Sequence, residues 1–105
     1  MTTSFPSPFP SGYTIYSKSK CDYCVQVKTI IQKNHFSFEE INCDDYLLER
    51  KEEFLSFIHG LAQKEYRTFP MVFYNGQFVG GFNETKTHVA REACFLEDGN
   101  TCDDF

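Results

Sequence analysis

The sequence predicts one α/β domain in which helices cover both faces of a mixed four-stranded sheet, and three observations support this fold class. Two short runs of β-branched and aromatic residues flank a segment with apolar residues at helical spacing, which is the pattern of a βαβ unit. An Asn-Gly pair between two further β-rich runs is typical of a tight hairpin. The chain has 105 residues, of which 41% are hydrophobic, and this is enough for one core in one domain.

The N-terminal half contains the expected βαβ unit and a second helical region. Strands are predicted over 13–16 and 38–41. The helix between them is predicted over 22–34 from four apolar residues at helical spacing, Cys24, Val27, Ile30 and Ile31. The second helical region runs from about 44 to 65, with the apolar stripe Leu47, Phe54, Ile58 and Leu61. Gly60 weakens this helix by about 1 kcal/mol, so a break at this residue is an open alternative.

The C-terminal half completes the sheet with a hairpin. Strands are predicted over 71–74 and 77–79 around Asn75-Gly76, which suits a type I′ turn because both residues tolerate positive φ. A last helix is predicted from about 84 to 95. The order β-α-β-α-β-β-α then combines a parallel βαβ unit with an antiparallel edge. We expect an irregular leader over 1–11, the domain over 12–96 and an acidic tail over 97–105.

The composition argues against two classes of partner. The net charge is -5, whereas phosphate binding needs clustered positive charge, so nucleic acid is not an expected partner. No apolar run reaches the roughly 18 residues of a membrane span, and the N-terminus lacks the basic start and apolar stretch of a secretory signal. Five cysteines without secretory context indicate a reducing compartment, so we expect a cytoplasmic protein that does not bind membranes.

The segment "YSKSKCDYCVQVK", residues 16–28, places two cysteines at the expected start of the first helix. Unpaired N–H groups and the helix dipole favour a thiolate at Cys21, and Lys18 and Lys20 add positive charge. The pKa of Cys21 should therefore fall below the free value of about 8.5, which makes Cys21 the attacking nucleophile. Cys24 lies one turn further along the same helix face, so it is the expected resolving cysteine.

A C-x-x-C pair can also be half of a zinc site, as in a zinc-stabilised binding module. Such a site needs a second ligand pair at similar spacing, and Cys43, Cys94 and Cys102 stand alone. The three histidines are scattered as well. We therefore expect no resident metal, a buried apolar role for Cys43, and no assigned role for Cys94 or Cys102.

Three separated motifs resemble the glutaredoxins. The segment "YSKSKCDYC" resembles their strand, lysine and C-x-Y-C site, "RTFP" resembles their R-T-V-P loop, and "NGQFVGGFNE" resembles their last hairpin with its double glycine. The resemblance runs from about residue 13 to 94 and implies a thioredoxin-like fold. It also implies a redox-active disulfide and the use of glutathione as co-substrate to reduce glutathione mixed disulfides and protein disulfides.

The resemblance further implies a glutathione site built from nine residues: Lys18, Tyr23, Arg67, Thr68, Phe69, Pro70, Gly81, Asn83 and Glu84. Lys18 and Arg67 match positions that hold the glycine carboxylate of glutathione. The backbone of Phe69, before a cis Pro70, matches the segment that pairs with the glutathione cysteine, and Tyr23 packs beside the thiol. Backbone N–H groups of Gly81 and Asn83 would face the other carboxylate. Glu84 would take the ammonium group.

The sequence departs from the family pattern in three places. The leader cannot supply the helix that often precedes the first strand, and the second helical region is a few residues longer than usual. In the third departure, the usual C-P-Y-C has become Cys21-Asp22-Tyr23-Cys24. Members without this proline tend to hold a [2Fe–2S] cluster between two subunits, with the first cysteine and glutathione as ligands. The alternative function is therefore a cluster-binding dimer that acts as carrier or sensor, with Cys21 as ligand; otherwise we expect a monomer.

Overall fold

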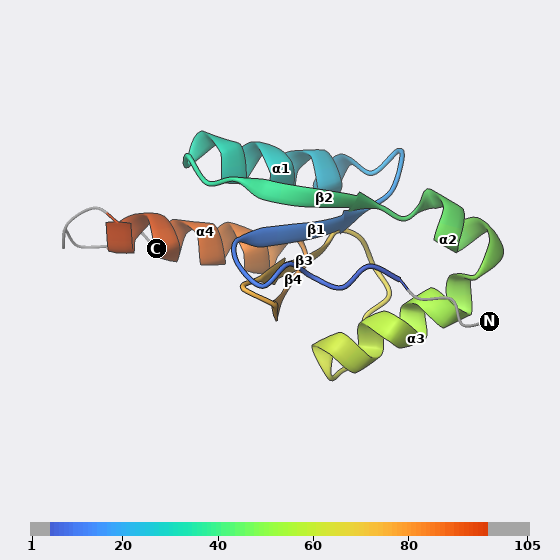
Figure 1. Ribbon diagram of the computed structural model, residues 1–105. Coiled ribbons are helices and arrows are strands. Elements are labelled where there is room, and N and C mark those ends of the chain that lie inside the picture. Colours follow the sequence, from blue (N-terminus) through green and yellow to red (C-terminus); the bar gives the residue numbers. More distant parts are fainter. Residues whose placement is uncertain (1–4, 97–105) are drawn as a thin grey trace.

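The computed structural model describes residues 5–96, in which four strands and four helices form one layered unit (Figure 1). In chain order these are β1 (Tyr13–Ser17), α1 (Asp22–Lys33), β2 (Phe38–Asn42), α2 (Asp44–Glu49), α3 (Lys51–Ala62), β3 (Met71–Tyr74), β4 (Gln77–Gly80) and α4 (Phe82–Leu96). In this part of the chain, no helix is long and apolar enough to cross a membrane.

The four strands form one mixed sheet in the order β2-β1-β3-β4. β1 and β2 are parallel and are joined through α1, while β3 is antiparallel to both β1 and β4. Asn75 and Gly76 connect β3 to β4 and both have positive φ, at 52° and 83°, as the predicted tight turn requires. The predicted α/β class with a mixed four-stranded sheet is therefore confirmed.

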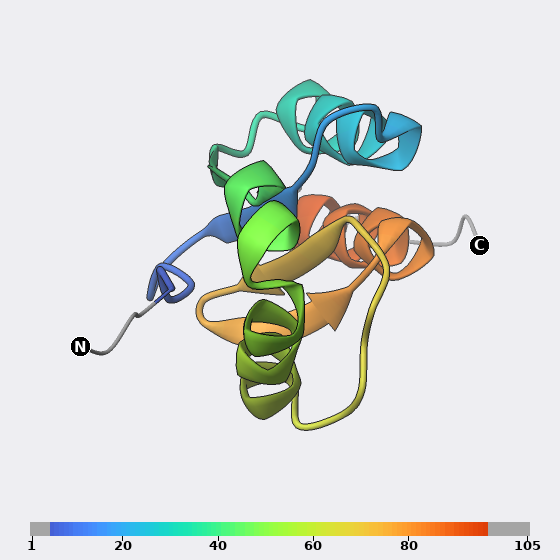
Figure 2. The same ribbon diagram turned by 90° about the vertical axis from the view of Figure 1, so that its right-hand side faces the viewer.

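Each face of the sheet carries its own hydrophobic core. Figures 1 and 2 show α1 beside α4 on one side and α2 running into α3 on the other. Because successive strand residues point to opposite faces, Tyr13 and Ile15 pack with α1 and α4, whereas Tyr16 packs with α3. The β1 residues are all buried, so the strand that leads into the cysteine pair is fixed from both sides.

The second helical region is divided into two helices, but not at Gly60, where a break had been an open alternative. Gly60 lies inside α3 without interrupting it, and the break falls at Arg50, between α2 and α3. The backbone of Arg50 leaves helical geometry, with φ -139° and ψ 45°, and its guanidinium stacks 4.6 Å from the ring centroid of Phe5. A tertiary contact therefore accompanies the break, while the intrinsic weakness of a helical glycine is tolerated at Gly60. α3 also ends at Ala62, before the expected 65, with Gln63 in a left-handed conformation.

Residues 5–11 form neither helix nor strand, but they pack on the α2–α3 face. The ring of Phe5 meets the rings of Tyr46, Phe54 and Phe57 at centroid distances of 5.0 to 5.4 Å. The hydroxyl of Tyr16 donates a hydrogen bond of 2.6 Å to the carbonyl of Pro6. This segment therefore covers a surface that would otherwise expose aromatic side chains. The expected domain boundaries stay predictions, and the expected acidic tail lies outside the described residues.

β2 lies at one edge of the sheet and carries two adjacent glutamates, Glu39 and Glu40, that are both exposed. β4 lies at the other edge and ends at Gly80, where the chain turns into α4. The cysteine pair and the start of α4 both follow directly on strands of this sheet.

Candidate redox site

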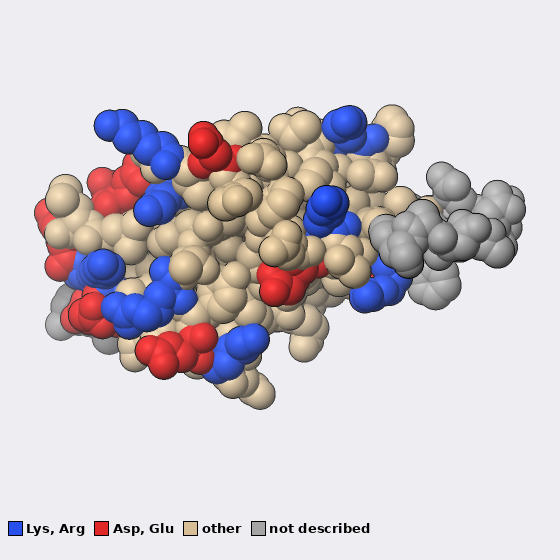
Figure 3. Space-filling model, turned by 180° about the vertical axis from the view of Figure 1, so that it is seen from behind, with Lys and Arg blue, Asp and Glu red and all other residues tan. Residues whose placement is uncertain are grey.

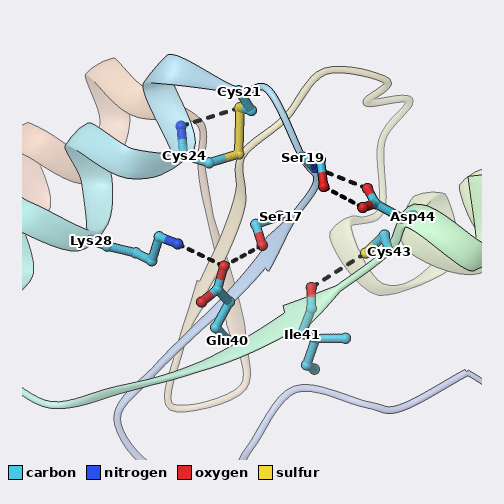
Figure 4. Close-up of a disulfide and its surroundings, with 9 residues drawn as sticks. All are labelled: Ser17, Ser19, Cys21, Cys24, Lys28, Glu40, Ile41, Cys43 and Asp44. Atoms are coloured by element: carbon cyan, nitrogen blue, oxygen red, sulfur yellow. Dashed lines mark hydrogen bonds and ion pairs between the residues drawn. A yellow bond between two sulfur atoms is a disulfide. The ribbon is translucent and has the colours of Figure 1, made fainter.

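Cys21 and Cys24 form a disulfide at the start of α1, with their Cα atoms 5.3 Å apart (Figure 4). Cys21 is the N-cap residue, and its Sγ accepts a 3.2 Å hydrogen bond from the backbone N–H of Cys24. The two cysteines differ in access, because Cys24 is only 1% exposed while Cys21 is partly exposed. A sulfur that is reachable from solvent and accepts a helix N–H is suited to attack, since such a donor stabilises the thiolate. The buried Cys24 sulfur is suited to resolve.

The loop before Cys21 is fastened to the start of α2 by Asp44. The backbone N–H of Ser19 donates to Asp44 Oδ1 at 2.9 Å, and the Ser19 hydroxyl donates to Asp44 Oδ2 (Figure 4). These bonds are the main reason that the pKa of Asp44 lies below its usual range. The two Ser19–Asp44 hydrogen bonds hold the loop that carries Lys18 and leads directly into Cys21.

A second polar cluster joins α1 to the sheet near the disulfide. Glu40 on β2 accepts hydrogen bonds from Lys28 at 2.8 Å and from Ser17 at 2.6 Å (Figure 4). The bond from Lys28 is the largest cause of a lowered pKa at Glu40. Lys28 is therefore engaged by a carboxylate of the same chain.

A groove of about 550 Å³ lies where the start of α1 meets the loop before β3 and the start of α4. Its lining residues are Tyr23, Tyr66, Thr68, Phe69, Pro70, Gly81, Phe82, Asn83 and Glu84. Seven of these nine belong to the glutathione site expected from sequence, so the fold brings together residues from three distant segments. Lys18 and Arg67 do not line the groove.

Aromatic packing sets the walls of this groove. The ring of Phe69 stacks on Phe54 of the α3 core at 6.3 Å, and the peptide bond from Phe69 to Pro70 is cis, as the resemblance implies. On the opposite side, the ring of Tyr23 lies 5.0 Å from that of Phe82. Tyr23 is 55% exposed, so its ring stands at the surface beside the disulfide.

The start of α4 forms one half of a capping box. The Glu84 side chain accepts the backbone N–H of Gly81 at 3.0 Å, and the Gly81 carbonyl accepts the N–H of Thr85 at 2.9 Å. Gly81 has no side chain, so the second bond of a capping box, from the cap side chain to a first-turn N–H, is missing. None of the hydrogen bonds found within residues 5–96 uses the N–H of Asn83 or Glu84. Two first-turn donors therefore remain open to an anion in the groove.

The Glutaredoxin family model matches residues 13–79, which is more than half of the chain. The chain belongs to the glutaredoxin family. The family expected from the three motifs is thereby confirmed, together with the redox role that the family gives to a C-x-x-C pair.

Relatives and solved structures agree with this assignment. The chain is 32% identical to Glutaredoxin-2, mitochondrial, of Mus musculus over 71 residues, which cover 68% of this chain and 43% of that protein. It is 30% identical to Glutaredoxin 1 of Rickettsia prowazekii over 70 residues, which cover 67% and 68%. The mouse and bovine relatives are longer proteins, of which the chain spans less than half.

Two crystal structures share the fold. Glutaredoxin 1 of Francisella tularensis, complexed with cacodylate, superposes with a TM-score of 0.67 at 28% identity, covering 76% of this chain and 93% of that one. Wheat glutaredoxin gives a TM-score of 0.61 at 32% identity, covering 73% and 69%. The expected thioredoxin-like fold is confirmed.

Two residues expected to bind a glutathione carboxylate lie at the edge of this glutaredoxin's groove region. Lys18 Nζ stands 5.7 Å from the ring centroid of Phe69, so it can reach the groove mouth. Arg67 is exposed and pairs with Glu52 of α3 at 3.2 Å. Figure 3 shows acidic and basic side chains mixed at the end of the molecule that carries α2, with a largely uncharged surface between this end and the other. Because Arg67 is paired with Glu52, it must leave this ion pair before it can bind a ligand.

Sequence reasoning missed four contributors to the site of this glutaredoxin: Ser19, Asp44, Tyr66 and Phe82. Ser19 and Asp44 are 25 residues apart, and no local pattern links them. Tyr66 immediately precedes the "RTFP" motif, and Phe82 lies inside "GGFNE", so both stood next to motifs that were recognised. The contact between Glu84 and Gly81 did have a signal, because a glutamate three residues after a helix cap is typical of a capping box.

The described part of the chain contains no group of three or more His, Cys, Asp or Glu side chains that could hold a metal ion. Cys43 is fully buried at the end of β2, and burial raises the pKa of its thiol to about 12. It therefore fits the expected role of a small buried apolar residue. The side chain of Cys94 and all of Cys102 lie outside the described part of the structure.

Proposed function

We propose that the chain is a glutathione-dependent thiol-disulfide oxidoreductase that reduces glutathione mixed disulfides and protein disulfides. The observation that carries the proposal is a redox-capable pair at a helix N-terminus, Cys21 and Cys24, with Tyr23 between them lining a groove that also contains six other expected glutathione residues. Membership of the glutaredoxin family supports it. The whole reaction, its glutathionylated or disulfide-containing protein partners, and a cytoplasmic location all belong to this proposal.

The monothiol route needs only Cys21. Its thiolate attacks the glutathione sulfur of a mixed disulfide, the S–S bond between glutathione and the protein breaks, and the released protein thiolate takes up a proton. Glutathione is then bonded to Cys21. The thiolate of a second glutathione attacks this glutathione sulfur, which releases glutathione disulfide and restores the Cys21 thiolate.

The dithiol route also uses Cys24. After Cys21 has attacked a protein disulfide, the Cys24 thiolate attacks the Cys21 sulfur and releases the reduced protein. The product is the Cys21–Cys24 disulfide, which is the state seen in the structure. Two glutathione molecules then reduce this disulfide and leave as glutathione disulfide.

The surrounding groups bind and orient rather than react. The N–H of Cys24 stabilises negative charge on Cys21 Sγ, from which it is 3.2 Å away. The backbone of Phe69, which precedes cis Pro70 in the groove wall, offers its polar groups to the peptide part of glutathione, and its ring packs on Phe54. The open N–H groups of Asn83 and Glu84 suit a carboxylate.

Paired serine substitutions test the assignment of roles. Cys21→Ser should abolish reduction of a glutathionylated peptide, because no nucleophile remains. Cys24→Ser should retain much of this activity and lose reduction of protein disulfides by the dithiol route. The assay couples glutathione disulfide formation to NADPH oxidation through glutathione reductase, with Cys43→Ser as the control. An active Cys21→Ser protein alongside an inactive Cys24→Ser protein would reverse the assignment.

The [2Fe–2S] alternative stays a prediction that rests on Asp22 in place of proline. Cys21 would be the only protein ligand from each of two subunits, and glutathione would supply the others. Anaerobic reconstitution with iron, sulfide and glutathione tests it, because the cluster-loaded protein would absorb visible light and elute as a dimer. A colourless monomer after a procedure that loads a known cluster-binding glutaredoxin would leave the oxidoreductase alone.

A further inference from the structure

We propose that the hydroxyl of Tyr66 is a further glutathione-binding group, which donates a hydrogen bond to the carboxylate of the γ-glutamyl residue. This inference rests on the proposed function and adds a specificity-determining residue to its site. Tyr66 lies outside the "RTFP" motif and was not among the nine residues that the family resemblance implies.

Tyr66 is fixed at the end of the groove where α4 begins. Its ring packs edge-on against Phe78 of β4 at a centroid distance of 4.9 Å. Its hydroxyl lies against Gly81, and a Cβ built on Gly81 would collide with that hydroxyl and come within 3.5 Å of the Pro70 carbonyl. The phenol oxygen therefore lies beside Gly81, directly before the first turn of α4.

The Tyr66 hydroxyl is available as a donor. None of the side-chain hydrogen bonds found within residues 5–96 uses it. It is also not among the buried atoms without a partner, which are Arg50 Nη1, His59 Nε2 and Thr85 Oγ1. Solvent therefore reaches this oxygen in the groove, and a ligand oxygen can replace water as its acceptor.

The groove needs such a donor because its charged groups are engaged or have the wrong sign. No Lys or Arg lines it, and the one charged lining residue, Glu84, is acidic. The Gly81 N–H is bonded to Glu84, and Arg67 is paired with Glu52. A γ-glutamyl carboxylate at this end must therefore be held by neutral donors, and the open N–H groups of Asn83 and Glu84 share the first turn with the Tyr66 hydroxyl nearby.

The lack of a side chain at Gly81 leaves room for the Tyr66 hydroxyl. The hydroxyl occupies the space that a Cβ would need, so any larger residue at position 81 forces the Tyr66 oxygen away from the helix start. Gly81 thus admits both the phenol and the ligand. This gives the glycine a function in addition to ending the hairpin.

The test is removal of the hydroxyl alone by Tyr66→Phe, which keeps the ring against Phe78. Two mixed-disulfide substrates share one peptide, and one carries glutathione while the other carries cysteinylglycine, which lacks the γ-glutamyl residue. Loss of one hydrogen bond to a charged group should raise KM for the glutathione substrate by about 10-fold and leave kcat unchanged. KM for the cysteinylglycine substrate should not change. Tyr74→Phe, which removes a hydroxyl at the far end of β3, is the matched control and should behave as the wild type.

Binding of S-methylglutathione, which cannot react, gives a second measurement that does not need turnover. Calorimetry should show a similarly weakened affinity in Tyr66→Phe and no change for S-methylcysteinylglycine. Equal effects on both ligands, or unchanged binding of S-methylglutathione with a lowered melting temperature, would mean that the hydroxyl is only structural and would overturn the inference. Absence of turnover in the wild type would instead refute the proposed function, and the binding result would still decide the role of Tyr66.

Discussion

Two cysteines of this chain, Cys21 and Cys43, differ in environment although both lie at the N-cap of a helix. Cys21 is partly exposed and accepts a backbone N–H, whereas Cys43 is fully buried and has no side-chain bond to the helix that it precedes. The Cys43 thiol instead points back to the Ile41 carbonyl at 3.5 Å. A helix N-terminus alone thus does not make a reactive cysteine; access and a donor aimed at the sulfur are both needed.

We expect Cys43 to resist alkylation in the folded protein. With a pKa of about 12, the thiol carries almost no thiolate at pH 7.5, and burial blocks its approach to a reagent. After reduction of the disulfide, iodoacetamide should label Cys21 within minutes and leave Cys43 unlabelled. Mass spectrometry of the peptides distinguishes the sites, and the urea-unfolded protein, in which both are labelled, is the control. Comparable labelling of the two residues in the folded state would contradict the environment described for Cys43.

At the scale of single residues, sequence identified most of the candidate site but not its internal bonds. The sequence motifs predicted the cysteine pair and seven groove residues, because each motif consists of residues that are neighbours in the chain. The partners of Ser19, Arg67 and Tyr66 could not be predicted, since each contact joins segments that meet only in the folded chain. These contacts decide which donors are free to bind a ligand.

At the scale of elements, local patterns predicted the strands, the hairpin and the type of every helix. They failed at the α2–α3 junction, where Arg50 leaves the helix and stacks on Phe5 near the N-terminus. A helical pattern records which residues face the core, but it does not record a contact 45 residues away. The packing of the leader could not be predicted for the same reason, because its prolines indicate an irregular path but not which residues that path contacts.

Phe5→Ala should destabilise the protein by about 1–3 kcal/mol, because the half-buried ring fills a site lined by Tyr46, Phe54 and Phe57. Activity measured well below the melting temperature should stay within twofold of the wild type, since the leader packs on the α2–α3 face and does not line the groove. Urea unfolding gives the stability. Phe9→Ala is the control, because Phe9 is 43% exposed and its loss should cost less than about 0.5 kcal/mol. Equal losses for both variants would show that the leader is not docked through Phe5.

At the scale of the whole molecule, the core on the α1–α4 side contains a polar contact that depends on pH. The Tyr13 hydroxyl and His88 Nδ1 are 2.8 Å apart, and the rings of Tyr13 and Tyr74 pack against the imidazole. Burial lowers the pKa of His88 below its ordinary value of 6.5, Glu92 opposes this shift, and Arg91 adds to it. The folded state therefore binds the His88 proton less well than the unfolded state does.

The sign of the pH dependence follows from this lowered pKa. The stabilisation is fully present above pH 6.5 and is lost as the pH falls through the lower pKa of the folded state. The free energy of unfolding in urea should therefore be smaller at pH 5.5 than at pH 7.5, and His88→Gln should reduce this difference. His35→Asn, at an exposed position with positive φ that Asn tolerates, should keep the full difference. An undiminished difference in His88→Gln would assign the pH dependence to other groups.

The two glutamates on β2 have a consequence for crowded solutions of this protein. An edge strand presents a row of unpaired N–H and C=O groups on which a strand of another molecule can build, and continued addition produces fibrils. Glu40 is paired with Lys28, but pairing β2 with its own copy would bring the exposed Glu39 carboxylates of both molecules together. Repulsion between the copies opposes that association, so the acidity of one short strand contributes to colloidal stability at neutral pH.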